Sequence, residues 1–410
     1  MIRMTKIAVV CLILMLIALE GLLHLFPLPD PDAYLRTSGT RRVHLFLPGW
    51  NAWSGWIGET PPFSKTFVTG PLIGVSTKRV VVTVNRFGFL YPETKAARKT
   101  SQEVRIGVIG GSTAECAALE QGKRWPDALE RLLSEETLGS SVTVLNLGVS
   151  GQDTRTHLAT VAQHAVKLDL DYLVFMLGAN DLIRADPAFE PLDRDDAFAS
   201  HECRCVRPFF MRFQLARRVR ALYHRLKGTE YYVRAAPIDQ PYFVARAREK
   251  LNLPILHTAR IEISRQALDD YEKNIVSLSA LAVAHDITPI FMTQPMLWKP
   301  AMNSSEEAVD WLAGTVESAG RRYRLPSSER ARAVETLNRQ LLETCSKRGF
   351  RCIDLEIRIP RSLQFFYDSV HLNEAGAESV ARYVAEFLLS EQTKERGRAS
   401  VREPYSMEEM

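Results

Sequence analysis

The stretch Val104-Arg-Ile-Gly-Val-Ile-Gly-Gly-Ser-Thr113 contains the strongest indication of the fold. Residues 104–109 are mostly apolar and favour a strand that is buried on both faces. Two glycines follow, which permit a tight turn, and the turn leads directly into Ser112. The stretch therefore predicts a buried strand that ends by lifting a serine hydroxyl out of the sheet edge.

Helices and apolar strands alternate on the C-terminal side of this stretch. Further strands are predicted at residues 142–147, 172–177, 288–292 and 352–355. Helices are predicted to open at Pro126 and near Asp153, to cover residues 258–285 and 328–348, and to begin again after Asn373. This order predicts an α/β fold in which helices cover both faces of a parallel sheet.

Three loops that leave the first predicted strands carry unusual clusters, Gly110-Gly-Ser-Thr113, Gly148-Val-Ser-Gly-Gln152 and Gly178-Ala-Asn-Asp181. Ligands bind at the carboxyl edge of open parallel sheets, so we expect the clusters to converge there. A Gly-Gly-Ser turn alone is equally typical of a plain turn or a phosphate-binding loop. The Lys followed by Ser or Thr that completes a P-loop is absent from it.

Asp368 and His371 could supply the base that a serine nucleophile needs. They lie three residues apart before the last predicted helix, close enough for a turn to bring carboxylate and imidazole together. Such a pair also arises often by chance, but its place in a strand-to-helix loop favours catalysis. Asn180 could donate a hydrogen bond to the oxyanion, although Asn180-Asp181 is also typical of a turn.

Taken together, four ordered blocks resemble the SGNH, or GDSL-type, hydrolase family. They are Gly110-Gly-Ser-Thr113, Asn146-Leu-Gly-Val-Ser-Gly151, Gly178-Ala-Asn-Asp181 and Asp368-Ser-Val-His371. The resemblance covers about residues 104–389 and implies a flavodoxin-like sheet. It further implies Ser112 as nucleophile, His371 as general base and Asp368 as the acid that orients it. The oxyanion hole would use the backbone N–H groups of Ser112 and Gly151 and the side chain of Asn180.

One position departs from the family pattern. Gly111 stands where an Asp usually precedes the serine. The departure removes a carboxylate from the first loop but none of the groups needed for attack, proton transfer or charge stabilisation. We therefore retain the catalytic assignment, for which no metal or organic cofactor is expected.

The N-terminal segment differs from the rest of the chain. Arg3 and Lys6 precede an apolar run over residues 7–26, which predicts a signal anchor at 1–29. A cleaved signal peptide is the alternative. We further predict a β-rich juxtamembrane region at 30–100, a hydrolase domain at 101–390 with a helical insertion at about 183–252, and a disordered tail at 391–410.

Composition and cysteine usage limit the class of protein further. The chain has 410 residues, of which 46% are hydrophobic and 24% charged, and its net charge of +4 is too small to indicate a nucleic-acid partner. Cys345 and Cys352 could form a disulfide that closes a short loop. Cys203 and Cys205, in the run His201-Glu-Cys-Arg-Cys205, favour a disulfide-type loop pair over a metal site.

The predicted function is hydrolysis of an ester through an acyl-enzyme, with O-acyl groups on an envelope glycan or lipid as the first choice of substrate. The predicted catalytic domain lies on the periplasmic or extracellular side of the membrane. One alternative is an O-acyltransferase that transfers the acyl group to a polysaccharide. A second is a non-catalytic glycan-binding or assembly protein that retains the fold.

Overall fold

The computed structural model describes residues 14–16, 18–22, 50–51, 56–57, 63–68, 72–76, 79–136, 141–185, 219, 247–312 and 314–400. These residues fall into two compact units. The larger unit takes its described residues from Phe63–Asn85, Phe89–Leu192 and Pro237–Met410. The smaller unit takes its described residues from Met1–Pro62, Arg86–Gly88 and Asp193–Ala236.

The smaller unit has little described secondary structure. Residues 14–16 and 18–22 are helical, and β1 (Trp50–Asn51) pairs with β2 (Trp56–Ile57) as a short antiparallel ladder. In the described part of the chain, no helix combines the length and hydropathy needed to cross a bilayer. The remainder of the predicted anchor, most of the predicted insertion and the run from His201 to Cys205 lie outside the described residues.

A five-stranded sheet forms the centre of the larger unit. Its strands are β5 (Glu103–Gly110), β6 (Ser141–Asn146), β7 (Tyr172–Met176), β8 (Thr288–Met292) and β11 (Arg351–Ile353). They lie in the order β6-β5-β7-β8-β11, and every neighbouring pair is parallel. This is the flavodoxin-like order, in which the switch point lies beside the first strand. The predicted parallel sheet is therefore confirmed, with Ser112 at the end of an inner strand.

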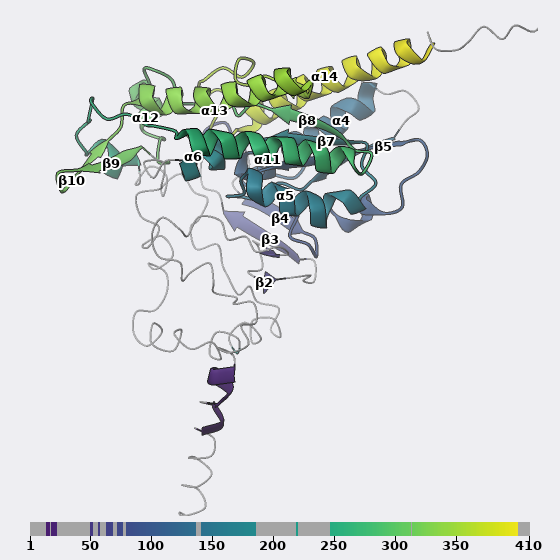
Figure 1. The fold of residues 1–410 in the computed structure, drawn as a ribbon, viewed down its shortest axis with the longest axis horizontal. Coiled ribbons are helices and arrows are strands. Elements are labelled where there is room, and N and C mark those ends of the chain that lie inside the picture. Colours follow the sequence, from purple (N-terminus) through teal and green to yellow (C-terminus); the bar gives the residue numbers. More distant parts are fainter. Residues whose placement is uncertain are drawn as a thin grey trace, which may run out of the picture. The chain divides into compact units, whose positions relative to one another are not determined.

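Helices cover both faces of the sheet. On one face, α4 (Trp125–Glu136) packs against α14 (Glu374–Ser400), and their apolar residues share a cluster with Ile106 and Val108 of β5. On the other face, α11 (Arg265–Val283) packs against α5 (Thr154–Gln163) and α13 (Ser327–Arg348). Figure 1 shows α5 and α11 side by side in front of the strands. The sheet is thus the middle of three layers.

Local sequence signals set several helix ends. Asp153 accepts hydrogen bonds from the N–H groups of Arg155 and Thr156 and completes a capping box at the start of α5. Ser264 caps α11, so this helix begins later than the predicted residue 258. Gly349 has φ +67° and ends α13, as its sequence position predicts.

The C-terminal helix extends beyond its predicted end. A disordered tail is predicted from residue 391, but α14 continues to Ser400. Arg351 Nε lies 3.0 Å from Glu391 Oε2, and this ion pair joins the helix to β11 just past the predicted boundary. Extending an existing helix avoids the cost of nucleation, so charged residues can continue it without an apolar face. Residues 401–410 lie outside the described residues.

Part of the predicted juxtamembrane region belongs to the larger unit. The hairpin of β3 (Phe63–Val68) and β4 (Arg79–Val84) and the 3-10 turn η2 (Glu93–Ala96) lie in the same compact unit as the sheet. The Ser76 hydroxyl donates to Glu374 Oε1 at 2.8 Å, at the start of α14. These contacts connect residues before position 100 to the C-terminal helix.

Several short elements have no counterpart among the predictions, except that a helical turn is predicted directly after Ser112. They are α3 (Ser112–Glu115), α6 (Ala179–Ala185), α12 (Ser304–Glu307), the 3-10 turn η3 (Ala165–Lys167) and the hairpin of β9 (Thr315–Ser318) and β10 (Arg321–Arg324). Most are single turns or pairs of short strands, which have too few residues for a clear hydrophobic period. Two of them, α3 and α6, carry the residues of the first and third glycine-containing loops.

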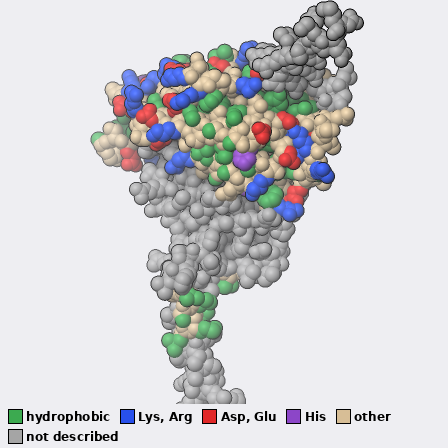
Figure 2. All heavy atoms as spheres, turned by 45° about the vertical axis from the view of Figure 1, so that its right-hand side comes forward, with side chains coloured by type: hydrophobic (Ala, Val, Ile, Leu, Met, Phe, Trp, Pro, Cys, Tyr) green, Lys and Arg blue, Asp and Glu red, His purple; other side chains and the backbone are tan. Residues whose placement is uncertain are grey.

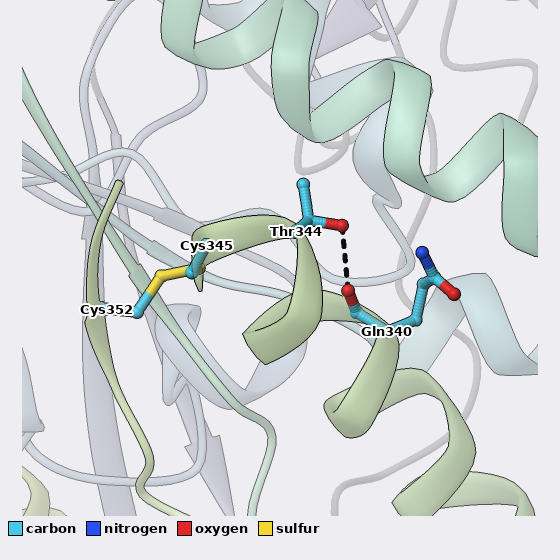
Figure 3. The surroundings of a disulfide bond; sticks show 4 residues. All are labelled: Gln340, Thr344, Cys345 and Cys352. Atoms are coloured by element: carbon cyan, nitrogen blue, oxygen red, sulfur yellow. Dashed lines mark hydrogen bonds between the residues drawn. A yellow bond between two sulfur atoms is a disulfide. The ribbon is translucent and has the colours of Figure 1, made fainter. Parts of the chain in front are cut away.

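A disulfide closes the connection between α13 and β11. Cys345 near the end of α13 is bonded to Cys352 of β11, with 6.3 Å between the Cα atoms, so the predicted bridge is confirmed (Figure 3). The hydroxyl of Thr344, the residue directly before Cys345, donates to the Gln340 carbonyl one turn earlier, at 2.8 Å. Cys116 is a free and buried thiol. The bridge lies at an edge strand, away from the serine.

Charged side chains of both signs are interspersed over the drawn face of the molecule (Figure 2). Nucleic-acid-binding surfaces gather Lys and Arg into a stripe or patch, and the face shown has no such grouping among its coloured residues. This distribution agrees with the nearly balanced charge of the sequence.

Candidate active site

Ser112 is the first residue of the short helix α3, directly after β5. Gly111 is the N-cap, and its carbonyl accepts hydrogen bonds from Ala114 N at 3.1 Å and Glu115 N at 3.0 Å. The first N–H groups of a helix have no partner inside it, so the N–H of Ser112 is free of the helical ladder. Ser112 itself is only partly buried. Its hydroxyl therefore lies at the accessible edge of the sheet, as predicted.

His371 approaches Ser112 from the far end of the chain. Its Nε2 atom lies 2.8 Å from Ser112 Oγ, and its Nδ1 atom lies 2.8 Å from Asp368 Oδ2. His371 and Asp368 both belong to the segment between β11 and α14. The structure thus brings the hydroxyl, imidazole and carboxylate into one hydrogen-bonded line, in which the ring can accept the hydroxyl proton.

Asp368 is completely buried, and backbone groups compensate for its lost hydration. Its Oδ1 atom accepts from Val370 N at 2.8 Å and from His371 N at 2.7 Å. Burial raises the pKa of the carboxyl, but the His371 ring and these hydrogen bonds outweigh burial and hold the pKa below its ordinary value. Asp368 is therefore an anion that can fix the tautomer of the imidazole.

Two aromatic residues contact the hydrogen-bonded imidazole and carboxylate of the site. The Tyr367 ring stacks on the His371 ring, with centroids 5.5 Å apart and planes 8° from parallel. The indole N–H of Trp311 donates to Asp368 Oδ2 at 2.9 Å. Neither residue is among those predicted from the sequence. Tyr367 is next to Asp368 in the sequence and could have been considered, whereas no local signal identifies Trp311.

The loop after β6 packs tightly against the loop that carries the serine. Asn146 Nδ2 donates to the carbonyls of Ala114 and Glu115, and its Oδ1 accepts from Gly148 N at 2.9 Å. A Cβ atom at Gly148 would lie 2.5 Å from Glu115 N, so only glycine permits this approach. The Ser150 hydroxyl donates to the Glu115 carboxylate. These contacts fix the position of the segment that contains Gly151.

Asn180 extends from the start of α6 into the same region. Its side chain is buried, and Nδ2 donates to the carbonyl of Gln152 at 2.7 Å. Gln152 follows Gly151, whose φ of +82° is a conformation that favours glycine. The predicted convergence of the three loops is therefore observed, and Gln152 of the second predicted cluster takes part through its backbone carbonyl.

A second group of hydrogen bonds holds α3 through Thr113. Thr113 Oγ1 donates to Gln294 Oε1 at 3.0 Å, and the N–H of Gln294 donates to Asn338 Oδ1 at 2.9 Å. Trp125 Nε1 donates to the carbonyl of Thr113 at 3.1 Å. Buried and satisfied bonds of this kind hold the turn after β5 in one conformation.

A hydroxyl, an imidazole and a buried carboxylate in line, at the carboxyl edge of a flavodoxin-like sheet, define the class of serine-hydrolase-like α/β proteins. Within that class, a model of the GDSL-like lipase/acylhydrolase family matches residues 108–378. The match covers more than half of the chain, and the chain belongs to this family, whose members are esterases and acylhydrolases.

Solved structures show similarity at low sequence identity. An acetylxylan esterase from Geobacillus stearothermophilus has a TM-score of 0.38 at 15% identity, with 70% of this chain and 96% of that chain covered. An α/β hydrolase from the metagenome of Lake Arreo, Spain, has a TM-score of 0.39 at 16% identity, with 69% and 94% covered. No curated protein matches the chain significantly.

Proposed function

We propose that this protein is a serine esterase that removes O-acyl groups from a glycan or lipid of the cell envelope. Membership of the GDSL-like lipase/acylhydrolase family supports cleavage of an ester. The observation that carries the proposal is the distance of 2.8 Å between Ser112 Oγ and His371 Nε2, together with the bond from His371 Nδ1 to buried Asp368. These distances are those of a nucleophile and a base already in contact.

In the proposed first step, Ser112 Oγ attacks the carbonyl carbon of the ester while its proton passes to His371 Nε2. The imidazolium that forms is stabilised by the Asp368 carboxylate. The bond between the carbonyl carbon and the alcohol oxygen then breaks, and the leaving oxygen receives from His371 the proton that came from Ser112. The products of this step are a free alcohol and an acyl group bonded to Ser112.

The negative charge on the carbonyl oxygen requires donors that are already in place. We assign this role to the N–H groups of Ser112 and Gly151 and to the Asn180 side chain. Asn180 Nδ2 carries two hydrogens, and the bond to the Gln152 carbonyl uses one of them. The second hydrogen is available for the oxyanion, and the first one fixes the direction in which it points.

In the proposed second step, His371 removes a proton from water, and the hydroxide that results attacks the acyl-enzyme. Collapse of the second tetrahedral intermediate releases the acid and returns the proton to Ser112 Oγ. The two steps use side chains and backbone N–H groups of this chain, together with water.

We further propose that the enzyme acts outside the cytoplasm, anchored by its N-terminal segment. The apolar run at residues 7–26 motivates this proposal, and the disulfide between Cys345 and Cys352 is typical of oxidising compartments. A reporter that is active only after export, fused after residue 390, tests the location. An inactive reporter in a fusion that accumulates to a normal level would contradict the proposal.

The catalytic assignment is tested by intact-mass measurement after treatment with a fluorophosphonate. We expect wild-type protein to gain one phosphonyl group and Ser112→Ala to gain none. His371→Ala is expected to react at least about 1,000-fold more slowly. Matched controls are Ser379→Ala, at a partly buried position outside the site, and His285→Ala, at an exposed one, and both are expected to react like wild type.

Labelling of Ser112→Ala at the wild-type rate would contradict Ser112 as the nucleophile. Absence of labelling in the wild type would contradict the esterase assignment as a whole and favour a binding protein. If labelling occurs as expected, release of free acid from an O-acetylated glycan establishes hydrolysis. Transfer of the acyl group to added glycan without release of acid would contradict it.

A further inference from the structure

The Asp368 carboxylate receives four hydrogen bonds, and one of them comes from a distant part of the chain. Oδ1 is held by two backbone N–H groups of its own turn. Oδ2 accepts from His371 Nδ1 at 2.8 Å and from Trp311 Nε1 at 2.9 Å. The indole is therefore the only one of these four donors that comes from outside the turn of residues 368–371.

The indole bond constrains the carboxylate oxygen that faces the imidazole. A carboxylate oxygen can accept two hydrogen bonds, and at Oδ2 the donors are the ring and the indole. With the indole bond in place, Oδ2 keeps its position when the imidazole turns or exchanges its proton. Without the indole bond, the imidazole would be the remaining one of these two donors at Oδ2, and the carboxylate and the ring could turn together about the Oδ1 contacts.

Trp311 is itself fixed by the residue before it. Asp310 is buried, its Oδ2 lies 2.7 Å from Lys250 Nζ and contacts Arg330 Nη1, and its Oδ1 accepts from Trp298 Nε1 at 2.9 Å. Burial raises the pKa of Asp310, but Arg330 and Lys250 outweigh burial and lower the pKa to about 2. Separating buried ions is costly, so this cluster holds the backbone at residue 310 in place.

The indole ring also supports the imidazole indirectly. Trp311 packs against an apolar cluster of Leu72, Ala118 and Tyr367, and the Tyr367 ring stacks on His371. One side chain thus touches the acid through its N–H and packs against the apolar cluster that contains Tyr367, the aromatic neighbour of the base. The packing and the hydrogen bond are separable, because Phe retains the first and lacks the second.

We infer that Trp311 is a positioning residue of the active site, which holds the Asp368 carboxylate in the orientation that aligns His371 with Ser112. The inference rests on the proposed esterase function. This positioning role adds no step to the reaction, since Trp311 donates its N–H to a side chain that does not touch the substrate. Its contribution is to keep the base aligned before the ester arrives.

Trp311→Phe tests the inference with p-nitrophenyl acetate as substrate and a fluorophosphonate as label. We expect kcat and the second-order labelling rate to fall by about 10- to 100-fold, as for loss of a hydrogen bond to a charged group. KM is expected to stay within about twofold, because the indole does not bind the small ester. A melting curve of each variant reports whether the fold is retained.

A double-mutant cycle separates positioning from general damage. Labelling rates of Asp368→Ala and of Asp368→Ala/Trp311→Phe are expected to agree within about twofold, because the indole then has no carboxylate to hold. An equal fall in both backgrounds, or a normal rate in Trp311→Phe, would overturn the inference while leaving the esterase intact. A wild type that neither turns over nor labels would instead overturn the esterase proposal and this inference with it.

Discussion

The side-chain amide of Asn180 occupies the space that a β-carbon at position 111 would need. An ideal Cβ at Gly111 would lie 2.3 Å from Asn180 Nδ2, which is far closer than two such atoms can approach. The φ of −81° at Gly111 is not left-handed, and the close approach of Asn180 is what excludes a β-carbon there. The position of the Asn180 amide therefore depends on having a residue without a β-carbon directly before Ser112.

Gly111→Ala is expected to lower kcat by about 10-fold, because the new methyl group displaces the amide from the Gln152 carbonyl and from the proposed oxyanion position. The measurement is steady-state hydrolysis of p-nitrophenyl acetate. The same substitution in an Asn180→Ala background serves as the control, since the methyl group then meets no amide and kcat should not fall further. A loss of similar size in that background would show that the glycine acts through another contact.

Asn180→Ala is expected to reduce kcat by about 100- to 1,000-fold with little change in KM, as for loss of one donor to a developing oxyanion. The bond to Gln152 is lost as well, so melting temperature is measured in parallel to separate catalysis from stability. A fall in melting temperature with normal kcat would assign Asn180 to structure alone.

Acid is expected to destabilise the protein through two histidines. Burial lowers the pKa of His157 to about 3, and burial together with Lys167 lowers the pKa of His164 to about 4. In the unfolded chain these groups bind protons near pH 6.5, so their contribution to stability is complete above that pH and is lost as pH falls towards 3.

The stability change between pH 6.5 and 4.5 is expected to approach about 1.4 kcal/mol per pH unit for His157 alone. Denaturant unfolding of His157→Met over this range should show a shallower dependence on pH than wild type. His285→Met, which changes an exposed histidine, is the matched control and should retain the wild-type slope. Equal slopes in all three proteins would contradict the assignment.

The disulfide between Cys345 and Cys352 closes a loop with a sequence separation of 7. By loop-closure entropy, its removal in Cys345→Ala/Cys352→Ala is expected to cost about 2–3 kcal/mol of unfolding free energy. Activity at 25 °C should remain near the wild-type level, because the bridge joins α13 to the outer strand β11. Reduced wild-type protein should unfold at the same denaturant concentration as the double variant. A large loss of kcat would show that the edge strand controls the site.

Buried regular elements were predictable from the sequence, because burial requires apolar residues in runs or at helical spacing along the element. The strand at Thr288–Met292 lies at its predicted bounds, and α13 ends at Gly349, where an αL residue ends the helix. The hairpin of β9 and β10 was not predicted, since half of its strand residues are charged, none is fully buried, and they show no clear alternation. Its one local signal is Gly320, with φ +71° at the turn.

The site was predictable only in part, for a related reason. Ser112, Asn180 and His371 follow strands of a parallel sheet, and the topology requires their loops to share an edge. Trp311 reaches the site through a contact that depends on loop conformation, which leaves no periodic trace in the sequence. The clash between Gly111 and Asn180 likewise becomes visible only when both side chains have coordinates.

The hydrogen bond between Ser112 and His371 joins residues 259 positions apart in the chain. During synthesis the ribosome therefore delivers the hydroxyl long before the imidazole, and a nascent polypeptide that stops anywhere between them has a serine but no base to activate it. Under the proposed roles, the enzyme is inactive during synthesis and during any translocation across a membrane. It becomes active only when the segment that carries His371 packs beside α3.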